Sequence, residues 1–288
     1  MKLAIVVDSS CGLTKKEAEK RGWYFLPLYL DIDGKEYKDG IDLNVDNFLK
    51  IYNENSIAKT SCTPIGEALQ LIEKLSKEND FVVIYPISMG LSSQQQNLEV
   101  ISKEFKNVFV IKSKNVCQLI VKDLVELEKD VLANEVTVKQ AISRIEKRDY
   151  TQAPILLYPK DIQVLVRGGR LSPSAAKLAK LLRIFPVIGF QDGNLEKHDK
   201  GVTFTKTFYN TAIDHYKKLS KKNKITLMFL DTANPEADKM FEEFRNKINY
   251  TGPIIRYSIP PIIAAHTGYG AISIFFTYLE KDIKEYNF

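Results

Sequence analysis

Five short segments of this 288-residue sequence combine small, hydroxyl-bearing and charged residues, as ligand-binding segments do. They read DSS at 8–10, KTSCT at 59–63, SMGLSSQ at 88–94, RGGR at 167–170 and AHTGYG at 265–270. Each lies near the end of a predicted strand or helix, and ligands of α/β proteins bind at strand ends. Taken alone, these residues point to a cleft that accepts an anion.

The polar residues of these segments allow more than one interpretation. Ser92 precedes a predicted helix, so its hydroxyl could face an anion at the positive helix end or simply cap the helix. Thr60 and Ser61 could hold a ligand or form an ordinary turn. Arg170 could face the ligand or the solvent. His266 could belong to the site or be a partly buried histidine whose hydrogen bonds are satisfied elsewhere.

Several catalytic or metal sites are excluded by spacing. MGLSSQ lacks the second glycine of a G-x-S-x-G nucleophile elbow, and no glycine-rich segment continues into the Lys-Ser/Thr of a P-loop. The three histidines, His198, His215 and His266, are scattered, with the first in a predicted hairpin and the second on a lysine-rich helix. We therefore expect no metal centre.

Composition indicates an ordinary globular chain, with 44% hydrophobic residues and a length suited to two domains or one large one. Only five apolar residues, Leu3–Val7, precede Asp8, and no stretch approaches the roughly 20 apolar residues of a membrane span, so we expect a cytoplasmic protein. The net charge of +5 comes from 41 basic and 36 acidic residues, and no nucleic-acid-binding motif is present. Without C-x-x-C spacing, the cysteines should be reduced thiols: Cys11, Cys62 and Cys117.

The elements that must position these segments alternate between buried strands and amphipathic helices, which predicts an α/β fold. In the first half, strands are predicted at 3–7, 23–32, 81–88 and 107–112, with a hairpin turn at 33–34. Helices are predicted from a capping box at 14–17 and at 48–52, 65–77, 116–132 and 138–147, with another after the GLS segment. This order indicates a mainly parallel sheet with crossover helices.

The pattern restarts around Asp149–Pro154, which divides the chain into domains 1–150 and 151–288. Strands are predicted at 154–159, 225–230, 252–259 and 271–279, with a hairpin that turns at Asp192-Gly193. Helices are predicted at 160–167, at 174–182 with Ser172 as N-cap, and at 236–248. The antiparallel elements make this half α+β.

Taken together, the five segments resemble the DegV family of bacterial lipid-binding proteins, whose members include the fatty-acid-binding subunits of fatty acid kinase. The similarity covers nearly the whole chain, in the family's order and spacing: VDSS at 7–10, KTS at 59–61, GLS at 90–92, GGRLS at 168–172 and AHTGYGA at 265–271. It implies an N-terminal Rossmann-like domain, a C-terminal α+β domain, and an acyl ligand in the cleft between them.

The resemblance also assigns roles to single residues. It implies that the hydroxyls of Thr60 and Ser92 bind the carboxylate of the ligand. Arg170, His266 and Ser61 would complete a polar network around this head group. No metal or cofactor is implied besides the bound fatty acid.

The sequence departs from the family pattern close to this head group. Where the family usually has Gln-Pro after Thr-Ser, and Gly-Thr after Gly-Leu-Ser, this chain has Cys62-Thr63 and Ser93-Gln94. A family Asp-Ser pair appears as Lys112-Ser113, and Lys-Pro-Ile appears as Phe185-Pro186-Val187. The predicted scaffold is unchanged, whereas the loops around the head group are altered.

We therefore expect a binding protein, not an enzyme, that presents a long-chain fatty acid to a separate fatty acid kinase for acyl-phosphate formation in phospholipid synthesis. One rival is an acyl-ester or acyl-phosphate hydrolase with Ser92 as nucleophile and His266 as base, which requires a hydrogen bond between them. Another is a lipid-sensing module without a kinase. The amphipathic segment at 173–185 could make transient contact with a membrane surface or the kinase, or simply cover its own domain.

Overall fold

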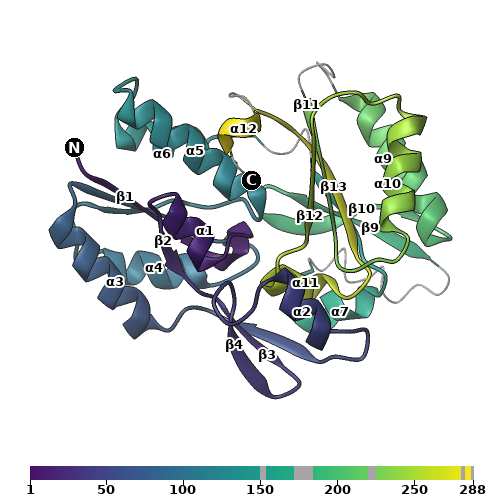
Figure 1. The fold of residues 1–288 in the computed structure, drawn as a ribbon, viewed down its shortest axis with the longest axis horizontal. Coiled ribbons are helices and arrows are strands. Elements are labelled where there is room, and N and C mark those ends of the chain that lie inside the picture. Colours follow the sequence, from purple (N-terminus) through teal and green to yellow (C-terminus); the bar gives the residue numbers. More distant parts are fainter. Residues whose placement is uncertain (150–153, 172–183, 220–224, 280–282, 287–288) are drawn as a thin grey trace.

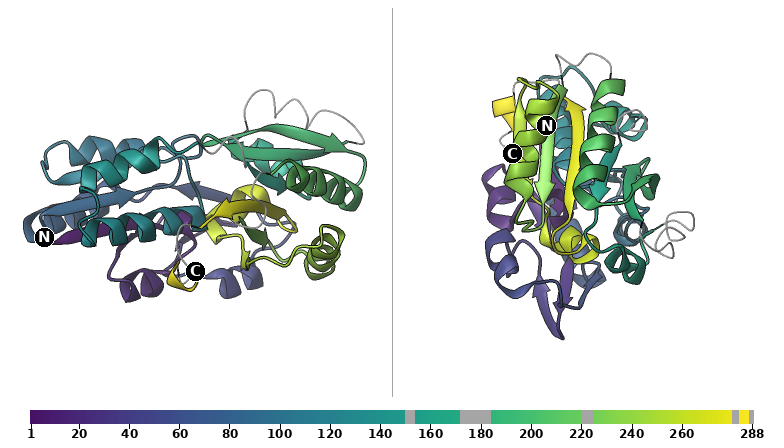
Figure 2. Two further views of the ribbon diagram at one scale, coloured as in Figure 1. Left: turned by 90° about the horizontal axis from the view of Figure 1, so that it is seen from above. Right: turned by 90° about the vertical axis from the view of Figure 1, so that its right-hand side faces the viewer.

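The computed structural model describes residues 1–149, 154–171, 184–219, 225–279 and 283–286, and these residues form three β-sheets flanked by helices (Figure 1). The molecule is elongated, with the first sheet at one end and the largest sheet at the other (Figure 2). The predicted helix at 174–182 lies outside the described residues. Within the described part, no helix is long and apolar enough to cross a membrane.

The first sheet is a parallel sheet in the order β2-β1-β6-β7. Its strands are β1 (Leu3–Asp8), β2 (Tyr24–Leu26), β6 (Phe81–Tyr85) and β7 (Val108–Val110). Its helices are α1 (Lys15–Lys20), α3 (Ile65–Glu78), α4 (Gln94–Ser102), α5 (Gln118–Leu132) and α6 (Val138–Glu146). One face of the sheet packs on α3 and α4 and the other on α1, α5 and α6, so its strands are continuous apolar runs.

The second sheet is small and antiparallel, in the order β4-β3-β5. It consists of β3 (Tyr29–Ile32), β4 (Lys35–Lys38) and β5 (Ala58–Ser61), with α2 (Val45–Ile51) between β4 and β5. The single strand predicted at 23–32 is therefore wrong, because its two halves belong to different sheets. Pro27 lies between them, and proline has no N–H group to continue a strand ladder.

The third sheet has the order β10-β9-β8-β13-β11-β12 and is antiparallel except for the parallel pair β11 and β12. Its strands are β8 (Ile155–Tyr158), β9 (Phe185–Gln191), β10 (Asn194–Gly201), β11 (Ile225–Asp231), β12 (Ile254–Ser258) and β13 (Ile272–Tyr278). The remaining elements are η1 (Ser9–Cys11), α7 (Ile162–Gly168), α9 (Phe204–Lys218), α10 (Ala237–Lys247), α11 (Pro261–Thr267) and α12 (Ile283–Tyr286). This mixed topology agrees with the predicted α+β character of the second half.

The two faces of the third sheet have different partners. The outer face packs on α9 and α10 through an aromatic cluster that includes Tyr158, Phe208 and Phe244. The inner face shares a core with residues of the first half, among them Leu28 and Phe48. This shared core lies where four of the five polar segments meet.

Candidate binding site

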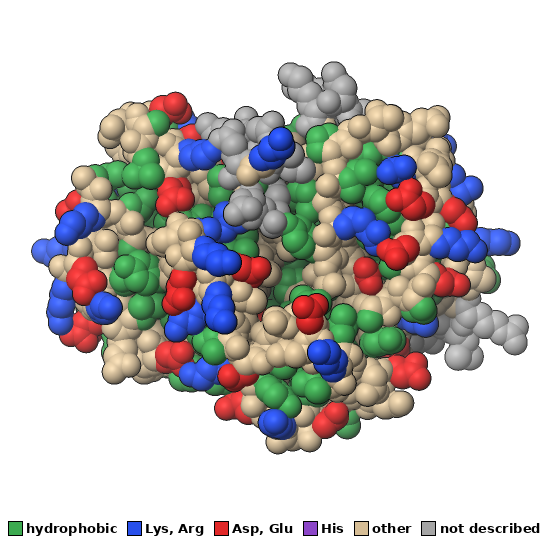
Figure 3. Space-filling model, viewed as in Figure 1, with side chains coloured by type: hydrophobic (Ala, Val, Ile, Leu, Met, Phe, Trp, Pro, Cys, Tyr) green, Lys and Arg blue, Asp and Glu red, His purple; other side chains and the backbone are tan. Residues whose placement is uncertain are grey.

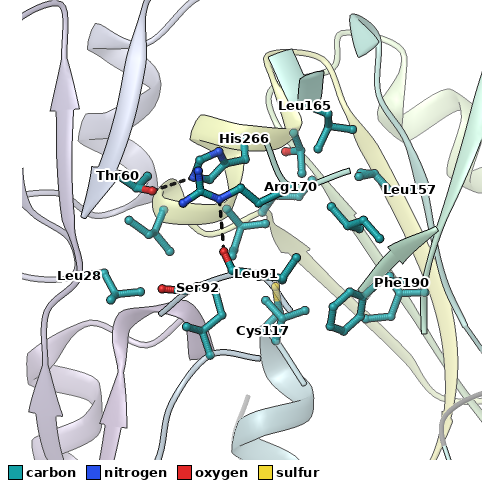
Figure 4. Close-up of a pocket in the computed structure, with 18 of the residues that line it drawn as sticks. Leu28, Thr60, Leu91, Ser92, Cys117, Leu157, Leu165, Arg170, Phe190 and His266 are labelled. Atoms are coloured by element: carbon teal, nitrogen blue, oxygen red, sulfur yellow. Dashed lines mark hydrogen bonds between the residues drawn. The ribbon is translucent and has the colours of Figure 1, made fainter. Parts of the chain in front are cut away.

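A cavity of about 160 Å³ lies between the inner face of the third sheet and the loops of the first two sheets (Figure 4). Most of its wall is aliphatic or aromatic, with contributions from Leu28, Ile87, Leu157, Leu165, Phe190 and Phe275. Polar side chains also border it, and they include all five predicted site residues: Thr60, Ser61, Ser92, Arg170 and His266. An apolar cavity with a few polar groups is typical of a small-molecule site.

Thr60 and His266 form the central polar contact of the cavity. The Thr60 Oγ1 and His266 Nε2 atoms are 2.7 Å apart, although the residues are 206 positions apart in the sequence. Both lie on regular secondary-structure elements, each near the end of its element. Thr60 is on β5, paired with Leu30, and His266 is in the last turn of α11, which begins with Pro261.

The surroundings of His266 keep its imidazole uncharged at neutral pH. Burial, with a smaller effect of the Arg170 charge, lowers the pKa of His266 to about 4. The ring also lies against the backbone of Gly168, where an added Cβ would be 2.6 Å from Nδ1. The first glycine of the RGGR segment is therefore required by the position of this ring.

Ser92 lies on the same side of the cavity as Thr60 (Figure 4) and is half-buried. The N-cap position of α4 is Ser93 and not Ser92, and the Ser93 side chain makes no capping bond. The Ser92 Oγ atom nevertheless accepts a hydrogen bond from the Gln94 N–H at 3.2 Å and lies 3.6 Å from Cys62 Sγ. Its own O–H can therefore donate to the thiol or to a ligand.

Arg170 joins two of the predicted segments. Its Nε–H donates to the Leu91 carbonyl at 3.2 Å, and its Nη1 donates to the Gly168 carbonyl at 2.5 Å. Figure 4 shows the guanidinium between His266 and Leu91. The arginine thus ties the RGGR segment to the GLS segment and adds positive charge beside His266. Ser61 borders the cavity but is exposed.

Two of the departures from the family pattern, at Thr63 and Gln94, contact each other. The Thr63 N–H donates to Gln94 Oε1 at 3.1 Å, and Gln94 Nε2 donates to Thr63 Oγ1 at 2.8 Å. The Thr63 hydroxyl in turn donates to the Pro27 carbonyl at 2.7 Å. This buried pair fastens the segment after β5 to the start of α4, directly behind Thr60 and Ser92. The sequence analysis did not predict this contact. The one signal for it was that both segments differ from the family pattern.

The DSS segment does not border the cavity but supports it from behind. Asp8 accepts hydrogen bonds from the Ser10 and Ile87 N–H groups, and the Ser9 hydroxyl accepts one from the Leu28 N–H. The segment therefore positions the backbone at two of the residues that line the apolar wall, Leu28 and Ile87.

Asp39 extends this support to the helix that carries His266. Its carboxylate is fully buried and interacts with the Ser9 hydroxyl and with the Ile262 N–H at the start of α11. Burial raises the pKa of Asp39 to about 7 and that of Asp8 to about 6. Sequence reasoning did not identify Asp39, because nothing local relates residue 39 to residue 262.

The geometry disfavours a Ser-His hydrolase. The hydrogen-bond partner of His266 is Thr60, and the contact of the Ser92 hydroxyl is Cys62. An imidazole with a pKa of about 4 is also a weak general base at neutral pH. In the described ranges, no group of three or more His, Cys, Asp or Glu side chains is arranged to hold a metal ion.

Comparison with known proteins places the chain in a family. The family model described as "Uncharacterised protein, DegV family" matches residues 2–279. A DegV domain-containing protein of Mycoplasmopsis pulmonis is 42% identical over 284 residues, which cover 98% of this chain and 97% of the relative.

Solved structures share the fold at lower identity. A DegV family protein of Thermus thermophilus, described for its fatty acid binding, has a TM-score of 0.80 at 20% identity, with 97% of this chain and 100% of that chain covered. DegV of Bacillus subtilis, described as a fatty acid binding protein, has a TM-score of 0.79 at 22% identity, with 96% and 99% covered. The chain belongs to the DegV family.

Proposed function

We propose that this protein binds a long-chain fatty acid, with the acyl tail in the apolar cavity and the carboxylate at the hydroxyls of Thr60 and Ser92. The observation that carries the proposal is the cavity itself, an apolar space bordered by these two hydroxyls and the uncharged His266. The two solved DegV structures described above as fatty acid binding support the same ligand class.

The tail and the head group would contribute differently to binding. Burial of each methylene stabilises the complex by about 0.8 kcal/mol, less the cost of association. A bilayer offers a similar gain, so tail burial alone cannot draw the acid from a membrane. A hydrogen bond to an ionised carboxylate is worth roughly 1.5–3 kcal/mol, and the two hydroxyls supply such bonds.

The polar network suits a carboxylate that must remain reactive. A neutral His266 that donates its Nε2–H to Thr60 Oγ1 leaves the Thr60 O–H to donate to the ligand. Arg170 adds positive charge from a position fixed by backbone carbonyls, without a direct contact to either hydroxyl. A carboxylate oxygen held by neutral donors keeps its nucleophilic lone pairs.

We further propose that the bound acid is presented to a separate fatty acid kinase in the cytoplasm, with residues 1–150 and 151–288 as the two domains around the ligand. The carboxylate oxygen would attack the γ-phosphorus of ATP held by the kinase, which yields an acyl phosphate and ADP. The sequence contains no P-loop of its own. ADP release that depends on this protein, its fatty acid and a purified kinase would support presentation. Tight binding without ADP release would favour a lipid-sensing module.

The binding proposal is tested by solvent extraction of the purified protein and mass spectrometry of the extract. Wild type should release a fatty acid in stoichiometric amount. Thr60→Val and Ser92→Ala should each weaken binding about 10- to 100-fold, because each loses one bond to a charged acceptor. Thr60→Ser is the matched control, since it keeps the hydroxyl and should keep the ligand. An empty wild-type extract, or a ligand that survives both substitutions, would overturn the proposal.

A further inference from the structure

The inner face of the third sheet forms part of the cavity wall, and its strand register determines which side chains point there. Residues directly opposite each other in antiparallel strands point to the same face. In β13, Ser273 is opposite Leu157 of β8 on one side and Leu230 of β11 on the other. All three residues border the cavity. Ser273 is therefore a hydroxyl between two leucines.

This hydroxyl has no partner within the described part of the protein. Ser273 is 7% exposed, and its side chain makes no hydrogen bond to any residue of the described ranges. Thr267, which also borders the cavity, has a fully buried Oγ1 that is unpaired among the described residues, whereas the Ser273 Oγ retains some exposure. Buried hydroxyls are normally paired, because an unmade hydrogen bond is unfavourable away from water. The wall of the cavity thus has unused hydrogen-bonding capacity.

We propose that the cavity prefers a hydroxylated fatty acid, with the hydroxyl of the acyl chain paired to Ser273. This inference rests on the proposed function and narrows its ligand class. A plain alkyl tail leaves Ser273 unpaired, whereas a chain hydroxyl at the right carbon would satisfy both groups. A hydroxyl at any other carbon would be buried against leucine and phenylalanine side chains and would weaken binding. The preference should therefore depend on the position of the hydroxyl.

The test compares stearic acid with a series of hydroxystearic acids that differ only in the carbon that bears the hydroxyl. Affinity for the delipidated wild-type protein is measured by calorimetry or by competition in native mass spectrometry. We expect one or two neighbouring positional isomers to bind at least about fivefold tighter than stearic acid, and the others to bind more weakly. Ser273→Ala should abolish this preference, so that every hydroxystearic acid binds more weakly than stearic acid.

Thr277→Ala is the matched control. Thr277 is on the same face of β13 and is also buried, but it does not border the cavity. This variant should keep the positional preference. If stearic acid binds and every hydroxystearic isomer binds more weakly, or if the preference survives in Ser273→Ala, the proposed hydroxyl preference is wrong. The proposed binding of a fatty acid would then still stand. If neither stearic acid nor any isomer binds, the proposed function fails with it. The wild-type series decides the question even if a variant does not fold.

Discussion

At the scale of single residues, two motif glycines are explained by what lies against them. A Cβ at Gly168 would be 2.6 Å from His266 Nδ1, and a Cβ at Gly90 would be 2.2 Å from the Gly193 carbonyl oxygen. In both cases a segment from elsewhere in the sequence occupies the space of a side chain. Neither glycine has the positive φ that would otherwise account for it.

Gly168→Ala should therefore damage the binding site specifically. The methyl group would push the His266 ring away from Thr60, and we expect about a tenfold loss of fatty acid affinity, equal to one hydrogen bond. Gly66→Ala is the control, because Gly66 lies in α3 with open space where a Cβ would stand and alanine favours a helix. Retention of the ligand is measured by extraction and stability by thermal unfolding. Equal ligand loss in both variants would contradict this account.

At the scale of elements, α11 is the helix on which the site depends. It contacts β5, β3 and η1 of the first half and α7 of the second. Its start interacts with the buried Asp39 carboxylate, and its last turn carries His266. Since Asp39 belongs to the first half and α11 to the second, this carboxylate helps to fix the histidine across the junction.

Asp39 should make stability depend on pH in a defined direction. Its folded pKa of about 7 is above the ordinary value of 3.8, so the folded state binds the proton more tightly than the unfolded state. The contribution of Asp39 to the free energy of unfolding is therefore most favourable below about pH 4 and falls as the pH rises towards 7. Burial lowers the pKa of His215 and His266 from 6.5 to about 4. The contribution of these histidines to stability therefore rises with pH over this range, opposite to that of Asp39. A comparison with a variant is thus needed to isolate Asp39.

The Asp39→Asn variant removes the charge but keeps a hydrogen-bond acceptor. Relative to wild type, it should gain up to about 1.4 kcal/mol in the free energy of unfolding for each pH unit between roughly 4 and 7. Denaturant unfolding across this range measures the difference. Asp39→Ala loses the hydrogen-bond acceptor as well, so its free energy of unfolding should be lower than that of Asp39→Asn at every pH. A pH-independent difference for Asp39→Asn would refute a buried titrating carboxylate.

At the scale of the whole molecule, the two halves are joined at several separate places around the cavity. The Ser88 hydroxyl donates to the Gly193 carbonyl at 2.8 Å, and Lys114 Nζ lies 2.5 Å from Asp192 Oδ1. The helix α12, from the second half of the chain, packs against α5 of the first half. There the fully buried Tyr286 donates a hydrogen bond to Glu126 Oε1 at 2.6 Å. Figure 3 shows Lys and Arg side chains interspersed with Asp and Glu side chains over one face of the molecule.

The contact between α12 and α5 should contribute measurably to the free energy of unfolding. Tyr286→Ala leaves a large cavity beside α5 and should cost about 3–5 kcal/mol, as for other large aromatic residues. Tyr286→Phe keeps the ring and loses the hydrogen bond to the Glu126 carboxylate, so it should lower the free energy of unfolding by about 1.5–3 kcal/mol. Both values come from denaturant unfolding. If Tyr286→Ala lowers the free energy of unfolding by no more than the roughly 0.5 kcal/mol of a surface substitution, the contact of α12 with α5 does not stabilise the protein.

Much of the fold could be predicted from the sequence because its signals are local. Apolar runs predicted β1, β6, β8, β11 and β13, and the capping box predicted at Thr14 is confirmed at the start of α1. The strand that carries KTS and the helix that carries AHT were missed. β5 is short and alternates in burial beside β3, and α11 is a brief apolar helix, so neither has a periodic pattern long enough to recognise.

The residue types of the candidate site were determined by the sequence, and their chemistry was decided by the tertiary structure. Thr60, Ser92, Arg170 and His266 were all predicted, and all border one cavity. Only folding brings Thr60 to His266 across 206 positions, and only burial beside Arg170 lowers the pKa of the histidine. Hydrogen bonds and pKa values depend on distance and solvent exclusion, and neither quantity is encoded in neighbouring residues of the chain.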